Sequence, residues 1–136
     1  MSAILLNPPA SEPLSVADAK SYLRVAHDDD DAIIAALIAS ARHHVEALTR
    51  TGLLTQTWRL TLDGWPESGR IKPKLGPLRS LAAARIYNES GTATSVDLDR
   101  FVIDEAAGVI AAPGWSLPLP GRAVRGIELD VTVGYG

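Results

Sequence analysis

The spacing of apolar residues changes once along this chain, near residue 55, and that change limits the folds open to it. After residue 55, apolar and polar residues alternate, so "TQTWRLTLD" places Trp58, Leu60 and Leu62 on one face of a predicted strand. Before it, apolar residues recur at three- and four-residue steps, which predicts a long amphipathic helix. They are Ile33, Ile34, Leu37, Ile38, Ala41, Val45 and Leu48. Helices that precede strands favour an α+β fold over alternating strands and helices.

The predicted helical part is an N-terminal hairpin of two helices within residues 14–51. The first helix lies in "PLSVADAKSYLRV", where Ser15 is the expected N-cap. On the second helix, Arg42 and Glu46 fall away from the apolar stripe and form a possible i,i+4 pair. The prolines within residues 1–13 predict an extended arm ahead of both helices.

Residues 54–136 are predicted to be β-rich and mainly antiparallel. Two hairpins are expected, with turns at 88–91 in "IYNESGTA" and at 105–108 in "DEAAGV". The clearest strand is "GIELDVTVGYG", in which every second residue from Ile127 onward is apolar. A chain of 136 residues is long enough to bury one core, so a single domain over 1–136 is expected.

Composition excludes several classes of function. The chain has no cysteine, which rules out disulfides, thiolate nucleophiles and thiolate zinc sites. Its formal net charge is −3, so no overall positive field recruits nucleic acid. The N-terminal sequence lacks the basic start of a signal peptide, and no apolar run is long enough to span a membrane. Synthesis in the cytoplasm and no membrane partner are therefore expected.

Four consecutive aspartates precede the long helix, and we call them the aspartate run: Asp28, Asp29, Asp30 and Asp31. A calcium loop that began at Asp28 would need glycine and glutamate where Ile33 and Ala39 stand. Aspartates at a helix start accept hydrogen bonds from free backbone N–H groups and meet the positive end of the helix dipole. The run is therefore predicted to cap the helix, with contact to a partner as the alternative, and no metal or other cofactor is expected.

The common local motifs for catalysis and cofactor binding do not occur in the sequence, whereas a Ser–His–Asp triad is recognised by geometry and not by spacing. There is no G-x-S-x-G, P-loop, dinucleotide-binding glycine pattern or H-E-x-x-H. His43 and His44 are adjacent, so they point in different directions on a helix and do not form a metal-binding pair. No catalytic residue is assigned, and the chain is predicted not to be an enzyme.

A basic segment follows the first predicted strand of the β region. Residues 70–85 contain five basic residues and no acidic one. Within it, Arg70, Lys72 and Lys74 alternate with apolar residues, and an extended chain presents them on one side. We call these three residues the basic strip. With Pro73 they suit the protection of a sheet edge; the alternative is contact with DNA phosphate or with an acidic surface, such as the aspartate run of an adjacent subunit.

The segment 112–122, "APGWSLPLPGR", is predicted to be a loop because it is rich in proline and glycine. Trp115, Leu117 and Leu119 lie between its prolines. Either these side chains fold back onto the core, or they form an apolar protrusion that contacts a partner protein.

Three segments in order carry a resemblance: "EPLSVADAKSYLRVAHDDDDAIIAALIASARHHVEALT", "LLTQTWRLTLDGWP" and a closing "VTVGYG". Together the chain resembles the head–tail connector, or adaptor, proteins of long-tailed bacteriophages and of phage-derived gene transfer agents. The resemblance covers most of the chain and depends on the order and spacing of these segments. It is strongest in the two helices and in Gln56–Thr57–Trp58, and looser between residues 66 and 125.

The resemblance implies a structural protein of the virion neck with no catalytic residues. Members of the family assemble as a ring beneath the portal protein, and a twelve-fold portal implies twelve copies. The ring extends the channel through which DNA passes without sequence-specific binding, and it presents a platform to the next, stopper-like tail-joining protein. In relatives the strand that resembles "VTVGYG" is followed by a further helix and a tail that helps docking on the portal, whereas this sequence ends at Gly136.

Two other classes of function remain open from the sequence. A small α+β ligand-binding domain or hydrolase would need a concave pocket with convergent polar groups. A nucleic-acid-binding module would use the basic strip and bind duplex DNA in a salt-dependent way.

Overall fold

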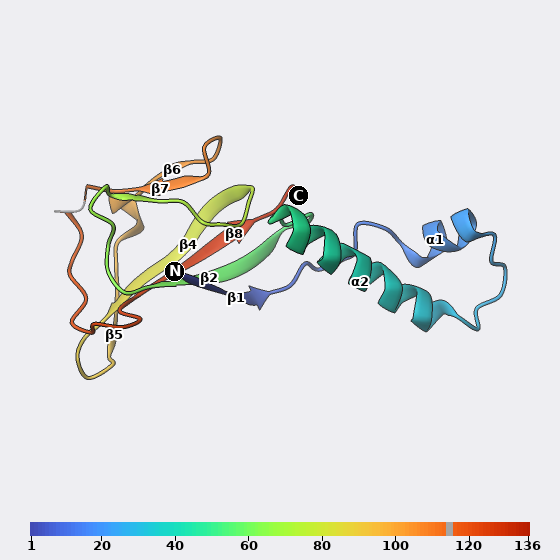
Figure 1. Ribbon diagram of the computed structural model, residues 1–136, viewed down its shortest axis with the longest axis horizontal. Coiled ribbons are helices and arrows are strands. Elements are labelled where there is room, and N and C mark those ends of the chain that lie inside the picture. The colour runs from blue at the N-terminus through green and yellow to red at the C-terminus, as the bar shows by residue number, and fades with distance from the viewer. Residues whose placement is uncertain (114–115) are drawn as a thin grey trace.

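The computed structural model describes residues 1–113 and 116–136 and has an α+β fold (Figure 1). Its helices are α1 (Val16–Leu23) and α2 (Asp31–Thr49), with a short 3-10 turn, η1, at Leu98–Arg100. The strands are β1 (Ser2–Asn7), β2 (Gln56–Leu62), β3 (Arg70–Ile71), β4 (Leu78–Tyr87), β5 (Ala93–Ser95), β6 (Val102–Asp104), β7 (Val109–Ala111) and β8 (Ile127–Val133). The predicted α+β class is confirmed, although one strand precedes the helices.

The strands form two sheets in which neighbours pair antiparallel, as predicted. The larger sheet has the order β1-β2-β8-β4-β5 and the smaller has the order β3-β7-β6. β8 lies at the centre of the larger sheet, between β2 and β4. Its alternate residues Ile127, Leu129, Val131 and Val133 are all 0% exposed. The clearest alternation in the sequence therefore belongs to the strand with the most completely buried face.

One apolar core joins the two sheets. Leu60 and Leu62 of β2 and the apolar face of β8 pack with Ile71 of β3 and Ile110 of β7. Both predicted hairpins are present, since β4 pairs with β5 and β6 pairs with β7. Gly91 and Gly108 occupy their turns with φ of 84° and 67°, a conformation that glycine adopts without strain.

The first part of the predicted extended arm belongs to the larger sheet. Residues Ser2–Asn7 form β1, which pairs with β2 at the sheet's edge, with Ala3 opposite Leu60. The arm is extended, as predicted, but the sequence "SAILLN" carries no apolar–polar alternation that would have indicated a strand.

Two local predictions for the helices are confirmed. The backbone N–H of Asp18 donates to Ser15 Oγ at 3.0 Å, so Ser15 caps α1. Arg42 and Glu46 form the i,i+4 pair, with Nη1 and Oε2 2.9 Å apart. The expectation that Arg42 faces away from the packed side of α2 is wrong, because its side chain is only 6% exposed and Nε also donates to Glu12 Oε2 at 2.6 Å.

The helical pair projects away from the two sheets, and α1 lies beside the half of α2 that is farther from them (Figure 1). Ala19 of α1 packs against Ile34 and Ile38 of α2. At the other end of α2, Gly76 N–H donates to Arg50 O at 3.0 Å and fixes the helix to the loop before β4. A 19-residue helix is ~28 Å long, so the aspartate run lies far from the sheets.

Candidate functional site

The aspartate run lies at the outer end, or tip, of the helical pair, where the chain enters α2. Lys20 Nζ of α1 is 2.7 Å from Asp28 Oδ1 and 2.9 Å from Asp31 Oδ1. Asp30 is the N-cap residue, but its side chain makes no hydrogen bond to the helix. The run begins the helix, as predicted, yet the expected side-chain capping is wrong, because Lys20 holds two of the carboxylates instead.

The tip presents negative charge to solvent. The hydrogen bond from Lys20 holds the pKa of Asp28 below its ordinary value, and the same contact raises the pKa of Lys20. Asp29 and Asp30 are exposed outside this bridge. Among the residues that the structure describes, no three side chains of metal-binding type lie together.

The basic strip follows the edge of the smaller sheet. Arg70 lies on β3, an edge strand, and Lys72 and Lys74 come directly after it. All three are exposed, whereas Ile71 and Pro73 between them are buried. The predicted alternation is therefore present, at a position that suits both edge protection and contact with an acidic partner.

Arg50 extends this positive surface, which the sequence did not indicate. A groove of about 560 Å³ is lined by Arg50, Lys72 and Lys74 and, on the β6–β7 turn, by Glu105. We call the three basic residues the basic cluster. Arg50 lies beside the two lysines because its neighbour Thr51 pairs with Gly76 in an isolated β-bridge. No local pattern in the sequence predicts that long-range contact.

Arg85 does not belong to the exposed basic surface, although it lies in the basic segment of the sequence. Its Nη2 donates to Asp130 Oδ2 at 2.6 Å, and Arg59 Nε donates to Asp130 Oδ1 at 2.8 Å. Burial would raise the pKa of Asp130, but the two guanidinium groups outweigh it and hold the pKa below its ordinary value. Beside them, Tyr87 OH donates to Glu128. The larger sheet thus carries paired charges on the face away from the core.

In the predicted apolar loop, one leucine packs on the core and another is exposed to solvent. Leu117 is 8% exposed and packs in the core, so it is not available to a partner protein. Leu119 is 80% exposed. Trp115 lies outside the described residues. The only part of the proposed apolar contact that the described structure presents to solvent is therefore Leu119.

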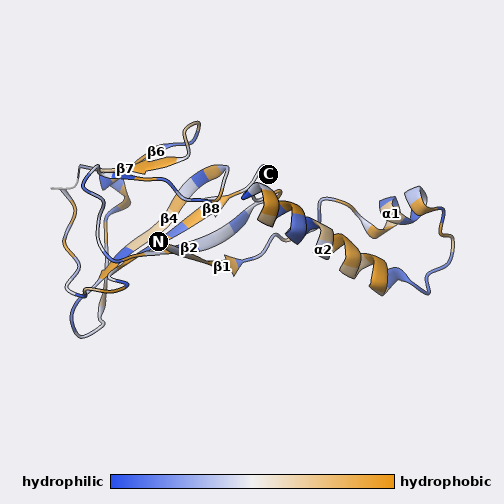
Figure 2. Ribbon diagram, in the orientation of Figure 1, coloured by the Kyte–Doolittle hydropathy of each residue, from blue (hydrophilic) through white to orange (hydrophobic). Residues whose placement is uncertain are grey.

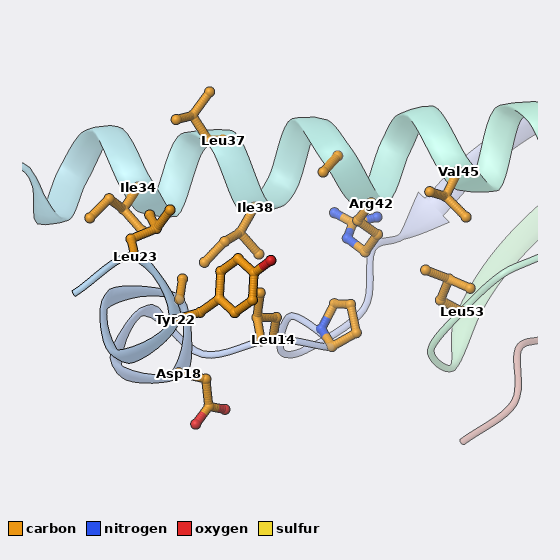
Figure 3. Close-up of a pocket in the computed structure, with 13 residues that line it drawn as sticks. Leu14, Asp18, Tyr22, Leu23, Ile34, Leu37, Ile38, Arg42, Val45 and Leu53 are labelled. Atoms are coloured by element: carbon orange, nitrogen blue, oxygen red, sulfur yellow. The ribbon is translucent and has the colours of Figure 1, made fainter. Parts of the chain in front are cut away.

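An open apolar groove of about 740 Å³ runs along the helical pair (Figure 3). Leu14, Tyr22 and Leu23 line it from the α1 side, and Leu37 and Val45 line it from α2. Apolar residues continue along most of α2 in Figure 2. Only Ile34 and Ile38 of the predicted stripe are buried, which the sequence could not show because it does not say how much of α2 its neighbour covers. No helix among the described residues is long and apolar enough to cross a membrane.

Solved structures of similar fold include chains of gene transfer agent (GTA) particles. A chain from the neck of an empty GTA particle, computed with C6 symmetry, has a TM-score of 0.82 and 26% identity, covering 100% of this chain and 72% of that one. A chain of the virion of a native gene transfer agent (GTA) particle has a TM-score of 0.74 and 27% identity, covering 100% and 73%. A chain from the neck of a native GTA particle, computed with C12 symmetry, has a TM-score of 0.74 and 25% identity, covering 100% and 71%.

No curated protein matches the chain. The family model of the phage gp6-like head-tail connector proteins matches residues 13–105, which include both helices, β2, β3, β4 and the β4–β5 hairpin. The solved neck chains carry the same fold over the full length of this chain. The chain therefore belongs to the phage gp6-like head-tail connector family.

Proposed function

We propose that this chain is a structural adaptor in the neck of a phage-like particle. It forms a ring between the portal protein and the next tail-joining protein, and the ring extends the DNA channel. The observation that carries the proposal is the likeness of the whole chain to a neck chain at a TM-score of 0.82, together with the match to the connector family. The adaptor acts by shape and repeated contacts and has no catalytic step.

The two charged surfaces suit contacts between neighbouring copies in such a ring. The aspartate run lies at the tip of the helical pair, and the basic cluster lies at the other end of α2. Contacts between two different patches on each copy are heterologous, and they close into a ring when the rotation per copy divides a full turn. Exposed ion pairs contribute only ~0–1 kcal/mol each, so the portal is expected to act as the template for closure.

DNA in the channel is the second candidate contact of the basic strip. Arg70 on the edge strand β3 and Lys72 and Lys74 directly after it are all exposed. A few phosphate contacts by such side chains position a duplex without reading its sequence. Leu119, exposed on the loop before β8, is the candidate contact with the portal or tail-joining protein.

Removal of the chain from particle-producing cells tests the proposed function. We expect DNA-filled heads and separate tails to accumulate, because no adaptor connects them. Supply of the unaltered chain from a second copy of its gene should restore joined particles, as counted by electron microscopy. Joined, infectious or gene-transferring particles formed without the chain would contradict the adaptor function, and a loss of packaged DNA with normal joining would do the same.

A further inference from the structure

Part of the apolar stripe on α2 has no cover from residues 1–113 and 116–136, which the structure describes. Ile33, Leu37 and Leu48 are 61%, 62% and 72% exposed, and with the smaller Ala41 they lie on one side of the helix. α1 packs against the adjacent side, through Ile34 and Ile38. Apolar surface left in water is unfavourable, so an uncovered stripe of this length favours association with another apolar surface.

Charge differs between the two ends of the same helix. Asp30 and Asp31 stand at its N-terminal end, and Arg50 follows its C-terminal end beside Lys74. Two such helices side by side in the same direction would bring aspartates near aspartates. In opposite directions, each acidic end would lie beside a basic end, and like charges would be kept apart.

We propose that the free protein forms a two-fold pair in which the α2 helices of two copies pack antiparallel along this stripe. With Ala41 at the crossing point, Ile33 lies opposite Leu48 of the second copy and Leu37 lies near Val45. The same register places Asp30 and Asp31 beside Arg50 of the second copy. Alanine at the crossing permits the close approach that packing of two helices requires.

A second copy meets each requirement that the stripe sets for its occupant. The occupant needs a helix as long as α2, an apolar stripe of the same spacing, and basic charge at the end that meets the aspartate run. α2 of another copy supplies the length and stripe, and Arg50 at its end supplies the charge. Tyr22 and Leu23 of α1, 88% and 57% exposed, flank the groove and widen the contact.

The pair is distinct from the proposed ring. A two-fold contact uses one identical patch on both copies, whereas a ring uses two different patches. The pair is thus a form of the free protein, and its copies separate before they join a particle. Both use the charges at the two ends of α2, but the mass in solution tests the pair and the arrangement in particles tests the ring, so failure of one is distinguishable from failure of the other.

Sedimentation velocity of the full chain at rising concentration and low salt tests the pair. We expect the mass to rise from 14.4 kDa toward twice that value. Leu37→Glu should raise the dissociation constant at least tenfold, because it places a charge in the apolar contact. Val102→Glu is the matched control, since Val102 is 69% exposed on β6 and lies outside the stripe; it should leave the constant unchanged. Circular dichroism checks that both variants are folded.

A charge exchange tests the direction of the helices. Asp30→Arg alone and Arg50→Glu alone should each weaken the pair, and the two together should restore it. Wild-type protein that stays at the monomer mass, an unaltered constant for Leu37→Glu, or a double variant as weak as the single ones would overturn the pair. Masses that grow beyond two copies would also overturn it, while supporting the heterologous contacts of the ring.

Discussion

Arg42 illustrates how a single buried charge holds the helical pair together. Its guanidinium binds Glu12, in the segment before α1, at 2.6 Å and Glu46 at 2.9 Å. Arg42→Ala would leave both carboxylates without their cation. Removal of one partner of a buried ion pair costs about 3–5 kcal/mol, and because Glu12 is partly exposed we expect about 2–3 kcal/mol. Urea denaturation measures this loss in the free energy of unfolding, and Arg24→Ala, at an exposed position, is the control. A loss below about 0.5 kcal/mol, typical of a surface residue, would contradict a stabilising role for Arg42.

Asp130 makes the stability of the fold depend on pH. Its pKa lies below the ordinary value of 3.8 because Arg59 and Arg85 outweigh the effect of burial. A carboxylate whose pKa is lower in the folded state stabilises the fold above the ordinary pKa, and that stability is lost as pH falls through the folded pKa. Asp130→Asn should therefore be less stable than wild type at neutral pH, by about 2 kcal/mol.

The difference between Asp130→Asn and wild type should then shrink as pH falls below about 4. Urea midpoints at neutral and acid pH for both proteins measure this narrowing. A difference that stays constant over that range would show that the carboxylate charge of Asp130 does not carry the stability.

At the scale of elements, sequence periodicity predicted what is local and missed what depends on neighbours. The alternation in β8 and the stripe on α2 gave the correct element types, and the turns at 88–91 and 105–108 gave both hairpins. β1 was missed as a strand because its partner residues in β2 lie fifty or more positions away in sequence. The uncovered side of α2 and the position of Arg50 beside the basic strip also arise from long-range contacts, so they became visible only in the fold.

The candidate site residues show the same division. The exposure of Arg70, Lys72 and Lys74 followed from their alternation, whereas Leu117 and Leu119 had similar surroundings in sequence and opposite burial. Proline-rich loops carry no period, so the sequence could not tell which of the two leucines reaches the core.

The basic strip yields a prediction for one edge of the smaller sheet. Replacement of Arg70, Lys72 and Lys74 by glutamine should leave the free energy of unfolding within about 0.5 kcal/mol of wild type, since all three are exposed. Joined particles should nevertheless become fewer, because the contact with an acidic surface or DNA is lost. Arg24→Gln, another exposed basic change, is the control. Normal yields of joined particles from the triple variant would leave edge protection as the role of the strip.

At the scale of the whole molecule, the length of α2 places the aspartate run far from the basic cluster. We expect the aspartate run of each copy to contact the basic cluster of the next around a closed ring. The resemblance to the connector family implies twelve copies around the DNA channel, and we expect the proposed ring to have that number. Electron microscopy of purified particles, with this chain located in the density, measures copy number and position. Each neighbouring pair should bring the aspartate run of one copy near the basic cluster of the next.

Charge reversal in the particle tests whether the aspartate run contacts the basic cluster of the neighbouring copy. Asp29→Lys with Asp30→Lys should lower the yield of joined particles, because like charges then meet at every contact around the ring, and the small cost per ion pair is repeated for each copy. Arg50→Glu with Lys74→Glu in the same chain should restore much of that yield, since it restores opposite charges across the contact. A ring that forms equally well with the two aspartate changes alone would show that the aspartate run of one copy does not contact the basic cluster of the next. A single copy per particle would show the same.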